Sequence, residues 1–293
     1  MAGPALVVPA VKKHTATVIM AHGLGDRVGL AENWRRRGKF EDVKFIFPNA
    51  PSIPITVVRQ WPLSLAKTKA HEQKLTDGLP TNCRTWASPC LVGEHYLSRP
   101  SAGSPRLPSD LTTTEEKQTT FDDLQEAHDE AGILRSRSVF NDLVAGEVSA
   151  GIASERIVLG GFSQGGAMAL FTGLTTPHKL AGIFGLSCYL LLGDKVKTLA
   201  AENGNANRDS RWFMGHGDAD PLVKYDWGVR TAEVLRKDLG VADLEFKTYH
   251  GLPHAADPLE IDHVEGFIRK CLAPVSEGGG GGAGGAGSKK GEL

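Results

Sequence analysis

The sequence predicts the α/β class, in which a mostly parallel central sheet is covered by helices on both faces. Short apolar runs typical of buried strands recur along the chain and alternate with stretches of helical spacing. Several of these runs end in glycine-containing turns, and the turns after parallel strands meet at one edge of the sheet, where ligands bind. The expected strands are 16–21, 43–47, 157–159, 181–186, 212–214 and 244–249.

Helices are expected between these strands, at 30–37, 124–152, 226–239 and 258–272. In the helix at 124–152, four apolar residues fall on one face and are expected to pack against the sheet: Phe140, Leu143, Val144 and Val148. The polar segment 201–210 is rich in glycine and asparagine, so a loop is expected there.

One domain is expected over 1–273, interrupted by an irregular insert at about 61–120. The insert shows neither the period of a strand nor that of a helix, and Pro, Ser, Thr and Gly are scattered through it. Because a structureless loop of this length is unusual inside a compact domain, we interpret it as a lid, a disordered insert or an error in the gene model. The segment 274–293 is dominated by glycine and is expected to be a disordered tail.

Composition argues against nucleic acid as a partner. The formal net charge is -1 and 41% of residues are hydrophobic, as in ordinary globular proteins. The one basic run, Arg35 to Arg37, has acidic neighbours, so a solvated surface is expected. No stretch approaches the roughly 18 apolar residues of a membrane helix, which predicts no integral membrane span.

The cysteines and the N-terminus predict a cytoplasmic protein, with the nucleus as a second compatible location. The four cysteines have neither metal-ligand spacing nor the number that a disulfide scaffold needs. The apolar run 5–10 lacks a preceding basic region and contains Pro9, so a secretory signal is not expected.

The stretch 156–174 contains the motif Gly161-x-Ser163-x-Gly165 between an apolar strand and a helix. This is the nucleophile elbow, in which a tight turn holds a serine hydroxyl out at the end of a strand. Ser163 is therefore the candidate nucleophile. The helix N-terminus beside it favours negative charge, which would stabilise an oxyanion.

A serine hydroxyl needs a histidine to remove its proton and a carboxylate to orient that histidine. In the expected order of serine, acid and histidine, Asp218 and Asp220 both follow the strand at 212–214, and His254 follows the strand at 244–249. We favour Asp220, because Pro221 restricts its backbone. Helix capping is the alternative role for either aspartate.

The other histidines near strand ends have less suitable positions. His250 and His263 are expected to be surface residues, whereas His22 and His216 precede glycines and are expected to hydrogen-bond the loops together. The backbone N–H groups of Gln164, after the nucleophile, and of Leu24, after the first strand, are the expected oxyanion hole.

Five motifs in fixed order resemble those of the acyl-protein thioesterase and lysophospholipase-type carboxylesterase family of the α/β-hydrolase fold. They are HGLGD at 22–26, FPNAP at 47–51, GGFSQGG at 160–166, LS at 186–187 and HGDADPLV at 216–223. The resemblance covers about 14–58 and 121–273. It implies Ser163, Asp220 and His254 as a catalytic triad without metal or cofactor, acting on thioesters of S-palmitoylated proteins, lysophospholipids or small esters. Transient contact with membrane-bound substrates is compatible with this activity.

Two departures from the family pattern support an alternative, a non-catalytic or impaired hydrolase-like protein. Relatives have a longer glycine-rich loop containing a tryptophan after the position of Asp26, whereas here 27–30 passes straight into a helix. Relatives also carry a Pro-x-Trp-x-Asp segment that lines the acyl site where the insert stands here. The complete triad favours the enzyme, and the altered loops favour the non-catalytic protein.

Overall fold

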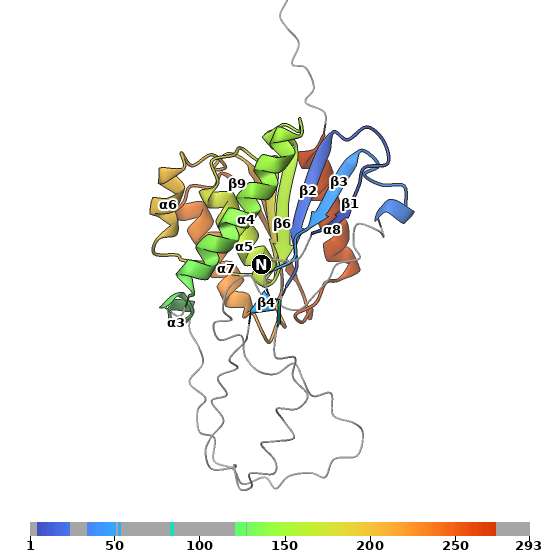
Figure 1. The fold of residues 1–293 in the computed structure, drawn as a ribbon. Helices are drawn as coiled ribbons and strands as arrows, with labels where there is room; N and C mark the ends of the chain where they lie inside the picture. Colours follow the sequence, from blue (N-terminus) through green and yellow to red (C-terminus); the bar gives the residue numbers. More distant parts are fainter. Residues whose placement is uncertain are drawn as a thin grey trace, which may run out of the picture.

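The central sheet has seven strands in the order β1-β3-β2-β6-β7-β8-β9 (Figure 1). The structure is a computed structural model that describes residues 5–23, 34–50, 52–53, 83–84, 121–126 and 128–273. All pairings are parallel except that of β1 with β3. The α/β class is thereby confirmed. The strands are β1 (Leu6–Val8), β2 (Ala16–Ala21), β3 (Val43–Phe47), β6 (Ile157–Phe162), β7 (Gly182–Leu186), β8 (Arg211–Gly217) and β9 (Asp243–Tyr249).

Helices cover both faces of the sheet (Figure 1). They are α3 (Phe121–Glu126), α4 (Glu130–Ser149), α5 (Gln164–Thr175), α6 (Val196–Glu202), α7 (Tyr225–Lys237) and α8 (Pro258–Cys271). Side chains of β2 alternate between two cores: Ile19 packs with residues of α4, α5 and α7, and Val18 packs with residues of α8. This alternation explains why the strands are apolar throughout, as expected for a doubly covered parallel sheet.

The strand β6 lies at the centre of the sheet and carries the elbow at its end. It pairs with β2 on one side and β7 on the other, with Gly161 opposite Ala21 and Phe162 opposite Leu186. Gly160 is required where β6 meets β7, because an added Cβ would lie 2.1 Å from the Phe184 ring. The parallel register brings the carboxyl ends of β2, β6, β7, β8 and β9 to one edge.

The helix expected at 124–152 is two helices. The first, α3, ends at Glu126, and the second, α4, begins at Glu130. Asp129 caps the start of α4, where its carboxylate accepts the Gly132 backbone N–H at 2.9 Å. Phe140 and Val144 are fully buried as expected, but Val148 is 37% exposed, so its placement on the packed face was wrong. The expected loop at 201–210 overlaps the end of α6.

Short strands were the other elements that the sequence pattern did not predict. The edge strand β1 has Leu6 and Val7 about half exposed, and it is held by antiparallel pairing with β3. A separate two-stranded sheet pairs β4 (Ser52–Ile53) with β5 (Cys83–Arg84). Of these two strands, β5 falls within the expected irregular insert. The remaining insert, the expected helix start at 30–33 and the tail at 274–293 lie outside the described residues.

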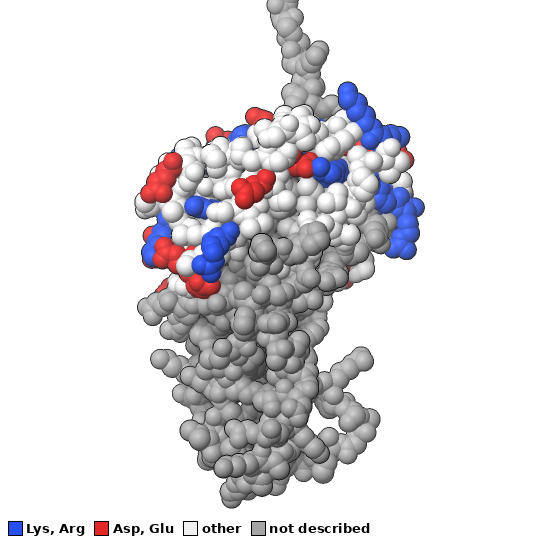
Figure 2. All heavy atoms as spheres, viewed as in Figure 1, with Lys and Arg blue, Asp and Glu red and all other residues white. Residues whose placement is uncertain are grey.

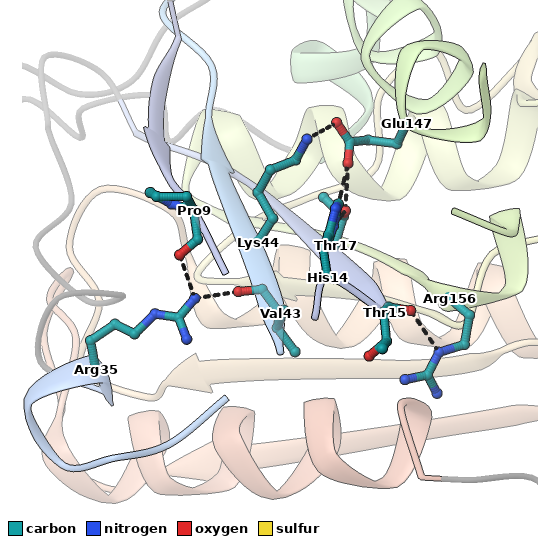
Figure 3. Close-up of polar contacts among 9 residues, drawn as sticks. All are labelled: Pro9, His14, Thr15, Thr17, Arg35, Val43, Lys44, Glu147 and Arg156. Atoms are coloured by element: carbon teal, nitrogen blue, oxygen red, sulfur yellow. Dashed lines mark hydrogen bonds and ion pairs between the residues drawn. The ribbon is translucent and has the colours of Figure 1, made fainter. Parts of the chain in front are cut away.

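Polar contacts hold the amino ends of β2 and β3 to α4 and to the short 3-10 helix Ser154–Arg156 that follows it (Figure 3). Glu147 of α4 accepts the Thr17 hydroxyl at 2.6 Å and pairs with Lys44. Arg156 donates to the carbonyl of Thr15 at 3.2 Å. These contacts lie at the edge opposite the elbow and anchor β2 and β3.

The basic run at 35–37 is only partly a solvated surface. Arg36 and Arg37 are exposed, and lysines and arginines gather at the edge of the molecule near β1 (Figure 2). Arg35 instead lies over the Phe45 ring and donates to the carbonyls of Pro9 and Val43 (Figure 3). The expectation of solvation was therefore wrong for Arg35, whose guanidinium binds backbone carbonyls that follow β1 and begin β3.

A buried carboxyl group lies in the core beneath β8. Glu260 of α8 is fully buried. Its Oε1 lies so close to the backbone of Gly215 that a Cβ added to that glycine would be 2.7 Å from it. Burial, with the nearby negative charges of Asp257 and Asp220, raises the pKa of Glu260 to about 8, against the opposing backbone N–H of Asp257. Glu260 is therefore mostly protonated at pH 7.

Because Glu260 keeps its proton in the folded state, Glu260→Gln should stabilise the protein as pH rises. The unfolded chain releases this proton near pH 4.5, whereas the folded chain holds it to about pH 8, so the native protein loses stability between these values and the variant does not. The free energy of unfolding of the variant, minus that of the native chain, should grow by a few kcal/mol from pH 5 to pH 8. Urea denaturation at several pH values measures it, and a constant difference would contradict the assignment.

Candidate active site

The elbow places Ser163 in a backbone conformation that few side chains adopt. Its φ is 55° and its ψ is -126°, and strain of this kind costs about 1–3 kcal/mol. The turn is held by a hydrogen bond from the Ser163 N–H to the Leu186 carbonyl at 2.8 Å. A Cβ added to Gly165 would lie 2.3 Å from the His22 carbonyl oxygen. A Cβ added to Gly161 would lie 2.5 Å from the Gly165 carbonyl carbon. Both glycines of the motif are therefore needed for the turn.

The structure brings the three predicted side chains into one hydrogen-bonded series. His254 Nε2 lies 2.9 Å from Ser163 Oγ, and His254 Nδ1 lies 2.7 Å from Asp220 Oδ2. The Asp220 side chain is fully buried, and that of His254 is 10% exposed. The imidazole also packs on the Phe162 ring, with ring centroids 4.9 Å apart. His254 can thus accept the Ser163 proton while Asp220 fixes its tautomer.

The loop after β8 fixes the Asp220 carboxylate. Its Oδ1 accepts the backbone N–H groups of Leu222 and Val223 at 2.8 and 2.9 Å, which leaves Oδ2 directed at His254. His216, fully buried behind the loop, donates its Nε2–H to the Val223 carbonyl at 2.9 Å. Burial lowers the pKa of His216, so this ring is neutral and acts as a hydrogen-bond donor to the loop, as the sequence predicted.

Asp218, the competing acid, lies in the same turn and has other partners. Its Oδ2 lies 2.8 Å from His250 Nδ1, and its Oδ1 accepts the Gly251 N–H at 2.6 Å. These hydrogen bonds hold the pKa of Asp218 below its ordinary value, with His250 the larger cause. Sequence reasoning missed this contact between loops, because nothing in the local pattern indicates which residue faces Gly251.

Two further histidines lie where the sequence placed them. His250 is largely exposed, as expected of a surface residue. His22 joins two loops: its Nδ1 lies 2.6 Å from the Gly23 carbonyl oxygen, and its Nε2 accepts the Ala50 N–H at 3.3 Å. His263 differs from its expected surface position, because its ring is only partly exposed and lies beside Tyr249, whose hydroxyl is 3.0 Å from the His263 Nδ1.

The expected oxyanion hole is described on one side. Gln164 is the first residue of α5, so its backbone N–H lies at the positive end of the helix dipole beside Ser163. Leu24 lies outside the described residues. The preceding Gly23 packs against the elbow, since an added Cβ would lie 3.2 Å from the Ser163 Cβ. Gly23, the last described residue before Leu24, therefore lies directly beside the nucleophile.

The described part of the chain holds neither a metal-ion cluster nor a membrane-spanning helix. Within those ranges, no three or more His, Cys, Asp or Glu side chains are grouped so that they could hold a metal ion. None of the helices described there is both long and apolar enough to pass through a bilayer. The altered loops that favour a non-catalytic protein lie outside these ranges, except for β4 and β5.

Comparison with known proteins gives close relatives over most of the chain. The acyl-protein thioesterase 1 of Emericella nidulans is 43% identical over 277 residues, which is 93% of this chain and 97% of the relative. The acyl-protein thioesterase 1 of Aspergillus fumigatus is 42% identical over 272 residues, covering 93% and 94% of the two chains.

Solved structures show the same fold. Esterase PE8 matches with a TM-score of 0.62 at 23% identity, and acyl-protein thioesterase 2 of Zea mays with a TM-score of 0.59 at 24% identity. Each comparison covers 92% of this chain and 99% of the solved one.

The phospholipase/carboxylesterase family model matches residues 2–62 and 105–272. This span includes the elbow, the loops that carry Asp220 and His254, and the strand that precedes Leu24. Together with the fungal relatives, this match shows that the chain belongs to the phospholipase/carboxylesterase family of serine hydrolases, enzymes of the α/β-hydrolase fold that cleave ester and thioester bonds.

Proposed function

We propose that the chain removes fatty acyl groups from S-acylated proteins, S-palmitoylated ones above all, and that the same site hydrolyses lysophospholipids and small carboxylic esters. The observation that carries this proposal is the series of hydrogen bonds from Ser163 Oγ through His254 to Asp220, at 2.9 and 2.7 Å. The names of the fungal relatives support the protein thioester as substrate.

In the proposed reaction, Ser163 Oγ attacks the acyl carbonyl while His254 Nε2 takes the hydroxyl proton. Asp220 stabilises the resulting imidazolium, and the N–H groups of Gln164 and Leu24 bind the oxyanion. Collapse of the tetrahedral intermediate breaks the C–S or C–O bond, and His254 returns the proton to the leaving thiol or alcohol. Water, deprotonated by His254, then attacks the acyl-enzyme and releases the fatty acid and Ser163.

The thioester bond suits this site because a cysteine thiol has a pKa near 8.5, so the thiolate leaves with little proton assistance. No cofactor enters the proposed reaction. We place it in the cytoplasm, with transient contact between the enzyme and acylated proteins on membranes.

Replacing the nucleophile, Ser163→Ala, is expected to abolish hydrolysis of p-nitrophenyl esters from acetate to longer acyl chains and of a palmitoylated cysteine peptide. The kcat should fall by about a million-fold, because removing the nucleophile removes the covalent route. Steady-state assays of the full chain measure this. The chain-length profile of the native enzyme then reports the size of the acyl pocket.

A fluorophosphonate probe separates the enzyme from the non-catalytic alternative. The native chain is expected to be labelled and the Ser163→Ala variant to stay unlabelled at equal concentration. A native chain that folds, but neither hydrolyses these substrates nor reacts with the probe, would favour the impaired protein and contradict the proposal.

Asp220→Asn is expected to lower kcat by about 10,000-fold, because an amide in place of the carboxylate favours the wrong imidazole tautomer. Asp226→Asn, a matched change on the exposed first turn of α7, is expected to keep kcat within about two-fold, since surface changes are usually small. Circular dichroism shows whether both variants fold. Equal activity in the two variants would rule out Asp220 as the acid.

A further inference from the structure

The acid and the base of the triad come from separate loops that are in direct backbone contact. Asp220 follows β8, and His254 follows β9. At Gly217, an added Cβ would lie 2.0 Å from the Leu252 carbonyl oxygen, so the two loops leave no room for a side chain there. The Asp218 N–H also donates to the Tyr249 carbonyl at 3.2 Å. The two segments are therefore packed against each other through their backbones.

Both carboxylate oxygens of Asp218, in the loop after β8, contact the loop after β9. Oδ1 accepts the Gly251 N–H at 2.6 Å, and Oδ2 lies 2.8 Å from His250 Nδ1. Gly251 has a φ of 72°, a left-handed turn conformation that glycine adopts without cost, and it lies three residues before His254. The carboxylate thus holds the turn through which the chain reaches His254.

The two contacts hold different groups: one is made to an exposed side chain and the other to the backbone of the turn. The His250 side chain is 88% exposed, and exposed ion pairs contribute little. The hydrogen bond from a backbone N–H to a carboxylate is charge-assisted and stronger than one between neutral groups. Because the Gly251 contact is made to the backbone of the turn itself, it is the one that fixes the turn, and an uncharged oxygen in the same place retains part of it.

We propose that Asp218 is a positioning residue for the reaction, which ties the 250–254 loop to the Asp220 loop and so sets the alignment of His254 between Asp220 and Ser163. This inference rests on the proposed function of the triad. It gives the two aspartates of the HGDADP motif different tasks: Asp220 contacts the imidazole, and Asp218 acts on it through the backbone.

Asp218→Ala is expected to lower kcat for a p-nitrophenyl ester by about 10- to 100-fold with KM within about three-fold, because a misplaced base slows the chemical step. Asp218→Asn keeps a side-chain oxygen opposite the Gly251 N–H and is expected to restore kcat to within about five-fold of the native value. His250→Ala, which removes only the exposed pair, should behave like Asp218→Asn. Steady-state kinetics at a temperature where all variants are folded measure the split between kcat and KM.

Asp129→Ala is the matched control for stability, because it also removes an aspartate that accepts a backbone N–H, at 2.9 Å. It is expected to lower the melting temperature and to leave kcat within about two-fold. An Asp218→Ala variant that keeps the native kcat, or that changes only its melting temperature as Asp129→Ala does, would overturn the proposal.

A readout that needs no turnover is the low-field NMR signal of the His254 Nδ1 proton shared with Asp220. Asp218→Ala is expected to shift or broaden this signal, and Asp218→Asn to restore it. An unchanged signal in Asp218→Ala would overturn the positioning role even if the native chain were inactive. If the NMR signal changes as expected but no Ser163-dependent hydrolysis is found, the proposed function alone is overturned and the positioning role stands.

Discussion

The parallel register of β6, β8 and β9 is the constraint on which the site depends. Ser163, Asp220 and His254 are far apart in sequence, yet each follows the carboxyl end of one of these strands. The elbow adds the second condition, since Ser163 keeps its φ of 55° only while glycines at 161 and 165 let the turn close against His22. A shift of one residue in any pairing would turn the strand side chains to the other face and separate the three groups.

The electrostatics around the triad follow from which groups are charged. Asp220 is buried with both oxygens hydrogen-bonded, so its charge is directed at His254. His216 and Glu260 lie close to it in the core, and burial favours the neutral form of each near pH 7. In a site of low dielectric constant, a second charge there would alter the proton affinity of the imidazole. Neutral neighbours leave Asp220 as the carboxylate that faces the His254 ring.

Most strands and the order of the site residues could be predicted from the sequence because their signals are local. Apolar runs such as 16–21 identify buried strands, and the motif around Ser163 requires its own turn. The strand β1 could not be predicted, because it has three residues and depends on a partner about 40 positions away. The Asp218 contact with Gly251 and the Arg35 contacts with loop carbonyls also join distant segments, and no pattern in a single segment specifies them.

The most direct test of the central claim is to trap the acyl-enzyme. The native chain is mixed rapidly with a p-nitrophenyl ester, quenched in acid and digested, and the peptides are weighed by mass spectrometry. We expect a burst of p-nitrophenol and one acyl group on the peptide that contains Ser163. Steady turnover with no acyl group on that peptide, or with the group on another residue, would contradict it.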